Sequence, residues 1–233
     1  MTQHGFIAKR STLSQHIEIL NRLTENYDEN TQLDMIYLDF SKAFDRVSHP
    51  KLLHVLHNFK LTPTLVNWIK DYLTNRKQAT VVDNCMSDFK YISSGVPQGS
   101  VLGPLMFLMY IDDLLKTLDH NCPSTKVYAF ADDVKLMSKQ PTDLQQGLTI
   151  VENWAKNWQL TIQPAKSENI TFSRGHHPSS FIYNINGNPI EKTTTVKDLG
   201  IKITENLDWT PYLQQIKLKA EILIINIYHS SFI

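Results

Sequence analysis

Two adjacent aspartates interrupt an apolar stretch of the chain, and they restrict its local fold more than any other feature. Residues 127–131 precede Asp132 and Asp133, residues 134–137 follow them, and both segments are rich in apolar side chains. This pattern predicts a strand, a tight turn and a second strand. Aspartate favours turns, so a plain turn is one explanation. The second carboxylate, however, adds like-charge repulsion that a divalent cation would remove, which favours a metal site.

A third carboxylate fits the same site. Residues 33–40 form an apolar run that is typical of a buried central strand, with Asp39 at its carboxyl end. If this strand lies beside the hairpin, Asp39 converges with Asp132 and Asp133 in an oxygen-rich site suited to Mg²⁺. Two ions held there could clamp the attacking and leaving oxygens of a phosphoryl transfer. A solvated or capping role explains any one of these aspartates, whereas the three together predict metal binding.

Another Asp-Asp pair, Asp112 and Asp113, has different surroundings. It follows residues 103–111, which are rich in Leu and Met after a Gly-Pro start, and the apolar pattern continues to Leu118. This stretch predicts one helix with Pro104 near its first turn. The pair is therefore assigned to surface or capping roles.

The composition is that of a folded globular protein, with 42% apolar and 20% charged residues in a chain of 233. Such a chain forms one domain or two small ones. A formal net charge of zero is mild evidence against nucleic-acid binding, although it is compatible with a local basic groove. Cys85 and Cys122 show no metal or redox spacing and fit a reducing compartment, nuclear or cytoplasmic. No signal segment or membrane-spanning stretch is expected.

Local patterns predict an α+β chain without repeats. Ser11 can cap a first helix that carries Leu13, Ile17 and Leu20 on one face. Further helices are expected near Pro50, near Pro63 with Thr62 as its cap, after Pro104, along the apolar face Leu144, Leu148, Val151, Trp154 and Trp158, and near Pro211. Further strands are expected in a hairpin of 77–82 with 89–93, and over 167–172, 181–190 with an Asn186-Gly187 turn, and 196–203.

Three further segments bear on function. Residues 94–104 place three glycines before a helix, so that a nucleotide could approach the backbone and Gln98 could bond a base or sugar; a simple turn is the alternative. Phe44 either packs in the core or walls the sugar of a bound nucleotide. Lys166 is a solvated lysine by default, and it lies near a triphosphate only if the strand that follows it enters the site.

These segments resemble the motifs of a known family. Residues 37–45, 95–104 and 130–133 occur in the order of reverse transcriptase motifs A, B and C. Their sequences are most similar to those of non-LTR retrotransposons of the jockey and chicken-repeat-like kind. His4-Gly5-Phe6 with residues 10–12 resembles the family's fingers motif, residues 158–173 resemble motif D, and residues 196–209 resemble motif E, the primer-grip region. The likeness covers nearly the whole chain.

The resemblance implies an α+β fold, namely a right-hand polymerase palm with an antiparallel sheet backed by helices. It places the palm and partial fingers in residues 1–203 and the start of a truncated thumb in 204–233. It also implies RNA-templated DNA synthesis, with an RNA template, a DNA primer and deoxynucleoside triphosphates as partners and no membrane. We further expect that the 233 residues alone polymerise poorly, because no endonuclease or fingers strands precede His4 and the thumb ends within an apolar stretch.

The resemblance also implies roles for individual residues. Asp39, Asp132 and Asp133 match the catalytic triad, and the Phe40 carbonyl matches an extra ligand of the two Mg²⁺ ions, for which Mn²⁺ could substitute. Phe44 matches the gate that rejects the ribose 2′-hydroxyl.

Other matching positions surround the nucleotide. Gln98 and Gly99 match the loop beside the incoming nucleotide and template, and Lys166 matches the motif D lysine, a proton donor to pyrophosphate. Ala43 lies where the sugar would pass, and Arg10 is a candidate contact of template or triphosphate.

Two other classes of protein fit parts of the pattern. The first is an inactive polymerase relic that only binds nucleic acid, against which the intact triad argues. The second is another palm-fold two-metal enzyme, such as a nucleotidyl cyclase, against which the Pro97-Gln98-Gly99 loop and the motif order argue.

Overall fold

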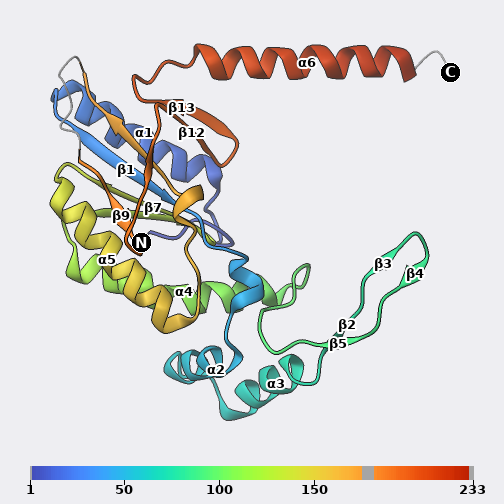
Figure 1. Cartoon of the computed structure of the whole chain (residues 1–233). Helices are drawn as coiled ribbons and strands as arrows, with labels where there is room; N and C mark the ends of the chain where they lie inside the picture. The colour runs from blue at the N-terminus through green and yellow to red at the C-terminus, as the bar shows by residue number, and fades with distance from the viewer. Residues whose placement is uncertain (1, 175–180, 231–233) are drawn as a thin grey trace.

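A central sheet with helices on both faces organises the chain in the computed structural model, which describes residues 2–174 and 181–230 (Figure 1). The strand order is β11-β8-β1-β7-β6, and every neighbouring pair is antiparallel except β11 with β8. The bounds of these strands are Leu33–Leu38 for β1, Lys126–Phe130 for β6, Asp133–Ser138 for β7, Glu168–Phe172 for β8 and Glu191–Lys192 for β11. The prediction of an α+β fold is confirmed.

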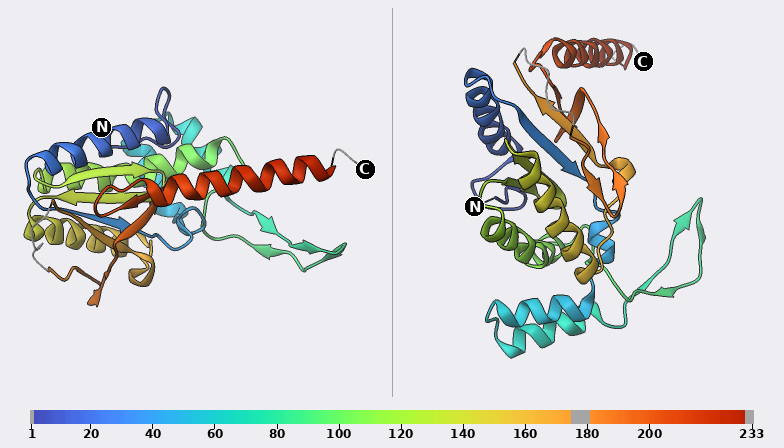
Figure 2. Two further views of the ribbon diagram at one scale, coloured as in Figure 1. Left: turned by 90° about the horizontal axis from the view of Figure 1, so that it is seen from above. Right: turned by 60° about the vertical axis from the view of Figure 1, so that its left-hand side comes forward.

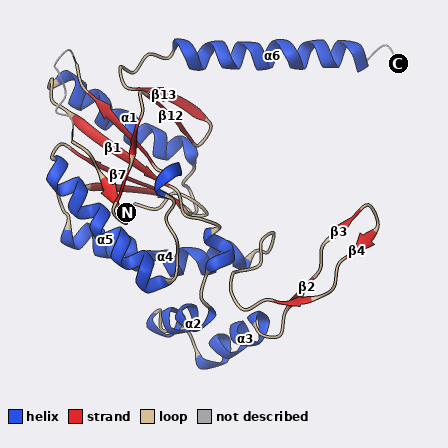
Figure 3. Cartoon of the chain, in the orientation of Figure 1, coloured by secondary structure: helices blue, strands red, loops and turns tan. Residues whose placement is uncertain are grey.

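The two faces of the sheet are covered by different elements (Figure 3). Helices α4 (Leu102–Asn121) and α5 (Pro141–Trp158) pack on the face to which Ile36 and Leu38 contribute. Helix α1 (Thr12–Asp28) and the hairpin of β12 (Thr195–Asp198) and β13 (Ile201–Thr204) cover the opposite face, which includes Met35. Side chains alternate between the faces along each strand, so Ile36 and Leu38 lie in one core while Met35 and Tyr37 contribute to the other.

Several elements project from this body (Figures 1 and 2). Helices α2 (His49–Asn58) and α3 (Pro63–Leu73) lead into an extended arm, in which β2 pairs with β5 and β3 pairs with β4. Helix α6 (Thr210–Ser230) extends away from the sheet. The remaining short elements are β2 at Lys77–Gln78, β3 at Val81–Val82, β4 at Cys85–Met86, β5 at Lys90–Tyr91, β9 at Asn184–Ile185, β10 at Asn188–Pro189, and the 3₁₀ turns η1 at Ala43–Arg46 and η2 at Pro164–Lys166.

The predicted helix starts are confirmed where a side chain caps the backbone. The Ser11 hydroxyl accepts a hydrogen bond from the Ser14 N–H, and the Thr62 hydroxyl accepts one from the Leu65 N–H. Each cap satisfies an N–H group that has no partner inside its helix. The predicted Asn186-Gly187 turn is also present, with both residues at positive φ.

The predicted apolar face of the first helix is wrong. Leu13 and Ile17 are 65% and 50% exposed, whereas the buried face of α1 carries Ile19, Leu23 and several polar side chains, Gln15, His16 and Asn26. Polar residues can occupy a buried helix face only when other groups supply their hydrogen-bond partners. Asn26 bonds Thr31 just beyond the helix, whereas the partners of Gln15 and His16 come from β7 and β12, which the local pattern of the helix does not encode.

The expected strand over 196–203 is two short strands. Residues Leu199 and Gly200 both have positive φ and reverse the chain between β12 and β13. No helix in the part of the chain that the structure describes is both long and apolar enough to cross a membrane. Residue 1 and residues 175–180 of the expected palm, and residues 231–233 of the expected thumb, lie outside the described ranges.

Candidate active site

The strand that ends at Asp39 lies beside the hairpin that carries the Asp-Asp pair. Strands β1 and β7 are antiparallel, and their last paired residues are Leu38 and Val134. Asp39 follows Leu38 and Asp133 precedes Val134, so the next position of the same register places Asp39 opposite Asp133. The condition on which the predicted convergence depends, adjacency of the strand and the hairpin, is therefore met.

The hairpin turn differs by one residue from the prediction. Ala131 and Asp132 form the turn, while Asp133 already pairs with Phe130 as the first residue of β7. Ala131 has a φ of 57° and is buried, Asp132 is half-buried, and Asp133 is exposed. The two aspartates therefore differ in setting, although they are adjacent in sequence.

Gln3 holds this turn from the edge of the sheet, a role that the sequence reasoning missed. Its Oε1 accepts hydrogen bonds from the Ala131 N–H at 2.9 Å and the Gly5 N–H at 2.8 Å. A Cβ atom at Gly5 would lie 2.6 Å from the Ala131 nitrogen, so only glycine permits this approach. The contacts of Gln3 and Gly5 with Ala131 span more than 120 residues of sequence, so no local pattern predicts them.

Loss of hydration beside the sheet raises the pKa of both Asp132 and Asp133 above the usual range of a carboxyl group, although the Asp133 side chain is still in contact with solvent. The charge of Asp39 raises the pKa at both positions further, whereas the Lys135 ammonium lowers that of Asp133. Crowded carboxylates of this kind are the oxygen donors that Mg²⁺ prefers. In residues 2–174 and 181–230, however, no group of three or more His, Cys, Asp or Glu side chains is arranged to hold a metal ion. The donor chemistry fits a divalent metal, while the side chains are not gathered as a closed set of ligands.

The segment that resembles motif D lies against the end of β1. The Asp39 carbonyl accepts a hydrogen bond from the Gln163 N–H at 2.9 Å, and the Asp39 N–H donates to the Ser167 hydroxyl at 3.3 Å. Phe40, the predicted extra ligand, is buried and forms a bridge with Ile162. These bonds position the backbone around Asp39.

Lys166 is exposed and ends the 3₁₀ turn η2, two residues before β8 begins at Glu168. Since β8 pairs with β1, the strand after Lys166 does enter the site. Arg10 is bonded within the N-terminal segment, where its Nη1 donates to the Gln3 carbonyl at 3.2 Å.

Phe44 is partly buried and packs against the core, as the first of the two roles considered for it requires. Its ring stacks on Phe107 of α4 with centroids 4.3 Å apart and an angle of 20° between the planes. Ala43 beside it is buried and belongs to the same core. Helix α4 thus supports the Phe44 ring through Phe107. Phe44 lies five residues after Asp39 in the sequence.

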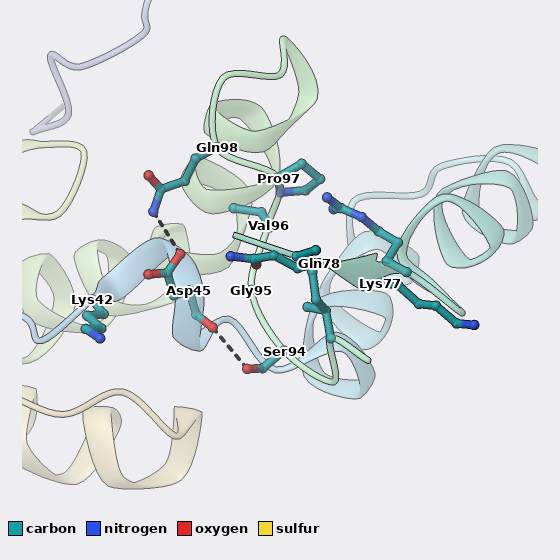
Figure 4. A pocket seen from close by; sticks show the side chains of 12 residues that line it. Lys42, Asp45, Lys77, Gln78, Ser94, Gly95, Val96, Pro97 and Gln98 are labelled. Carbon is teal, nitrogen blue, oxygen red and sulfur yellow. Dashed lines mark hydrogen bonds between the residues drawn. The ribbon is translucent and has the colours of Figure 1, made fainter. Parts of the chain in front are cut away.

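A cavity of about 820 Å³ opens between η1, the segment after Ser94 and the base of the arm (Figure 4). Gln98 lines it and donates a hydrogen bond from Nε2 to Asp45 Oδ1 at 2.8 Å, and the Ser94 hydroxyl donates to the Asp45 carbonyl at 3.0 Å. Asp45 is thus a site residue to which the sequence reasoning assigned no role. The remaining lining residues are Lys42, Arg76, Lys77, Gln78, Ala79, Ile92, Gly95, Val96 and Pro97.

Gly95 permits the close packing at this cavity. The Gly95 N–H donates to the Val47 carbonyl at 2.8 Å, and the residue has a φ of 88°. A Cβ atom would lie 2.7–2.9 Å from backbone atoms of Asp45. Gly99 also has positive φ, but its Cβ position is open.

The other Asp-Asp pair lies on α4, as predicted. Asp112 forms an ion pair with Lys116 at 2.6 Å, and Asp113 accepts a hydrogen bond from Trp154 Nε1 at 3.1 Å. The second bond joins α4 to α5, so Asp113 also has a packing role.

Comparisons with known proteins show the family and the fold of the chain. The sequence profile of the family described as "Reverse transcriptase (RNA-dependent DNA polymerase)" matches residues 1–203. The chain is 30% identical over 227 residues to the RNA-directed DNA polymerase from mobile element jockey of Drosophila funebris, covering 92% of this chain and 24% of that protein. It is 28% identical to the probable RNA-directed DNA polymerase from transposon BS of Drosophila melanogaster, covering 91% of this chain and 24% of that protein. The chain thus spans about a quarter of the length of these relatives.

Solved structures show the same fold at low sequence identity. Apo telomerase from Candida tropicalis superposes with a TM-score of 0.63 at 15% identity, covering 89% of this chain and 40% of that one. The predicted α+β palm fold is thereby confirmed. With the family profile matching residues 1–203, the chain belongs to the reverse transcriptase (RNA-dependent DNA polymerase) family, as a domain of the non-LTR retrotransposon type.

Proposed function

We propose that this chain carries the catalytic palm of an RNA-directed DNA polymerase that extends a DNA primer on an RNA template. The observation that supports it most directly is the pairing of β1 with β7, which brings Asp39 level with Asp133 beside the turn at Asp132. The jockey and BS relatives are named as polymerases of this kind. A telomerase relative in structure was solved with a fragment of telomeric RNA.

The proposed metal ligands are Asp39, Asp132 and Asp133, with the Phe40 carbonyl as a further donor. Two Mg²⁺ ions, or Mn²⁺ in their place, would supply activation of the primer 3′-hydroxyl and charge neutralisation at the leaving pyrophosphate. The protein's contribution is to hold these oxygens at the ends of two adjacent strands. The exposed Lys166 ammonium, at the end of η2 and just before β8, is the proposed proton donor to pyrophosphate.

The proposed substrate pocket is the cavity beside η1. Gln98 lines it, and Gln98 and the adjacent Gly99 are proposed to lie beside the incoming nucleotide. Ala43, next to the lining residue Lys42, is proposed to lie near the sugar, and Arg10 is the proposed contact of template or triphosphate. Lys42 and Arg76 in the lining add positive charge suited to phosphates. Gln98 would exchange its bond with Asp45 for one to the nucleotide or template.

Primer extension tests this proposal. The assay uses a labelled DNA primer on an RNA template with Mg²⁺, and it compares the 233-residue chain with a chimera in which the chain replaces the matching segment of the jockey polymerase. We expect extension by the chimera and its loss when the metal is chelated. Binding of the primed template without extension, by a chimera whose jockey parent is active, would identify the chain as an inactive relic.

Phe44→Val tests the proposed sugar gate. Removing the ring opens space beside Ala43, so incorporation of ribonucleotides relative to deoxyribonucleotides should rise. The loss of the stack on Phe107 should also lower stability by about 1–4 kcal/mol. Incorporation ratios measured in the chimera decide the matter, and an unchanged ratio in a folded variant would return Phe44 to a purely structural role.

A further inference from the structure

Four buried polar side chains and the half-buried Tyr37 meet between the sheet and its covering elements, on the face opposite α4 and α5. Lys135 Nζ forms an ion pair with Asp198 Oδ1 and donates to Gln15 Oε1 at 3.0 Å. The Tyr37 hydroxyl donates to Asp198 Oδ2 at 3.3 Å, and His16 Nε2 donates to the Asp198 carbonyl at 3.0 Å. Lys135 and Asp198 are 2% and 1% exposed. This cluster joins β7, β1, α1 and β12, and no step of the proposed reaction uses it.

The cluster lies next to the proposed metal ligands along strands β1 and β7. Tyr37 and Lys135 are paired across β1 and β7, and Asp39 and Asp133 each lie two residues from one of them. Side chains two residues apart on a strand point to the same face. The Lys135 side chain is therefore the next one along this face of the sheet from Asp39 and Asp133. Its charge lowers the pKa of Asp133.

A lysine at this place is a competitor for the metal. Its side chain is long and flexible, and an ammonium group prefers a carboxylate partner when it is buried. The nearest carboxylate along its own strand is Asp133, whereas Asp198 comes from the separate hairpin β12–β13. Asp198 binds the ammonium inside the buried cluster, where Gln15 accepts a hydrogen bond from it and the Tyr37 ring centroid lies 5.8 Å from it.

We propose that Asp198 is a positioning residue that holds the Lys135 ammonium off Asp39 and Asp133, and so keeps these carboxylates free for divalent metal. The inference rests on the proposed metal site. Because Asp198 lies on β12, the seating of the β12–β13 hairpin against the sheet determines whether Lys135 is held. The hairpin belongs to the segment that resembles the primer grip, so this contact links that segment to the catalytic strand.

Mn²⁺ binding by the whole chain tests the inference without any need for polymerisation. Asp198→Asn removes the charge that holds Lys135 while keeping the side-chain shape. Free Mn²⁺ is measured by electron paramagnetic resonance at a temperature well below the melting point of each variant. We expect binding to weaken at least about tenfold, the effect that a positive charge in contact with a carboxylate has on its binding of a cation. A folded Asp198→Asn variant that binds Mn²⁺ as the wild type does would overturn the inference.

A double variant distinguishes competition by the Lys135 ammonium from a loss of fold stability in Asp198→Asn. Lys135→Met combined with Asp198→Leu replaces the buried ion pair by apolar groups of similar size, which buried sites often tolerate. It removes the competing ammonium, so Mn²⁺ binding should return to within about twofold of the wild type. Binding that stays as weak as in Asp198→Asn would show that Lys135 does not compete for the site.

Two further variants act as controls. Asp34 is also a buried aspartate on β1, but it bonds the Tyr183 hydroxyl at 2.5 Å at the far end of the strand, so Asp34→Asn should lower the melting temperature and leave Mn²⁺ binding unchanged. Asp133→Asn should abolish the binding. If Asp133→Asn binds Mn²⁺ like the wild type, the proposed metal site is wrong, and the inference fails with it. If only Asp198→Asn is without effect, the metal site stands and the inference alone fails.

Discussion

Asp132→Asn should reduce polymerisation by roughly 10³-fold, because it removes a charged oxygen ligand from the place where transition-state charge is stabilised. The side chain keeps its shape, so the hairpin turn and its bonds to Gln3 should persist. Initial rates of primer extension by the chimera with the jockey polymerase measure the loss. Full activity of the folded variant would contradict the assignment of Asp132 as a metal ligand.

The stability of this variant provides an independent check. Burial raises the pKa of Asp132, so the ionised form is the one that the fold disfavours, and this cost is present at pH values above that raised pKa. Removing the charge should leave the melting temperature at pH 7 equal or higher. Asp112→Asn on the surface of α4 is the matched control, and it should keep its activity, since its partner is the exposed Lys116.

Gly95→Ala should destabilise the fold by about 2–6 kcal/mol, because it combines strain at positive φ with overlap of backbone atoms. The new Cβ atom would lie 2.7–2.9 Å from the backbone of Asp45, which has no room to yield because Ser94 and Gly95 bond the same segment. The displacement of Asp45 would also break its bond with Gln98 and deform the cavity. Urea unfolding gives the stability change, and primer extension should fall with it.

Gly187→Ala isolates the strain from the overlap. Gly187 has a φ of 72°, but its Cβ position has no atom within 4 Å. The expected cost is only about 1–2 kcal/mol. Equal costs at Gly95 and Gly187 would show that the contact with Asp45 does not constrain residue 95.

Predictions that depend on neighbouring residues in the sequence were mostly confirmed. The strand before Asp39, the hairpin around Asp132 and Asp133, and the capped helix starts at Ser11 and Thr62 follow from patterns of a few residues. The order of the motifs was enough to indicate the family that the comparisons show. Local periodicity and caps act over one or two turns of chain, so the sequence displays them directly.

The failures concern burial that distant elements decide. The apolar residues Leu13 and Ile17 predict the wrong buried face for α1, since the true face carries Gln15 and His16. These polar side chains are buried because Lys135 and Asp198 offer them partners across more than 100 residues of sequence. Gln3 and Asp45 were missed as site residues for the same reason.

The sequence by itself determined the local elements of this protein and the set of carboxylates suited to metal. The tertiary structure alone decided that β1 pairs with β7 in a register that sets Asp39 opposite Asp133. It also decided that Lys135 pairs with Asp198 of the β12–β13 hairpin, on the face of the sheet opposite α4 and α5. A polar side chain becomes buried or functional through the groups that meet it in space, and a linear pattern does not contain those groups.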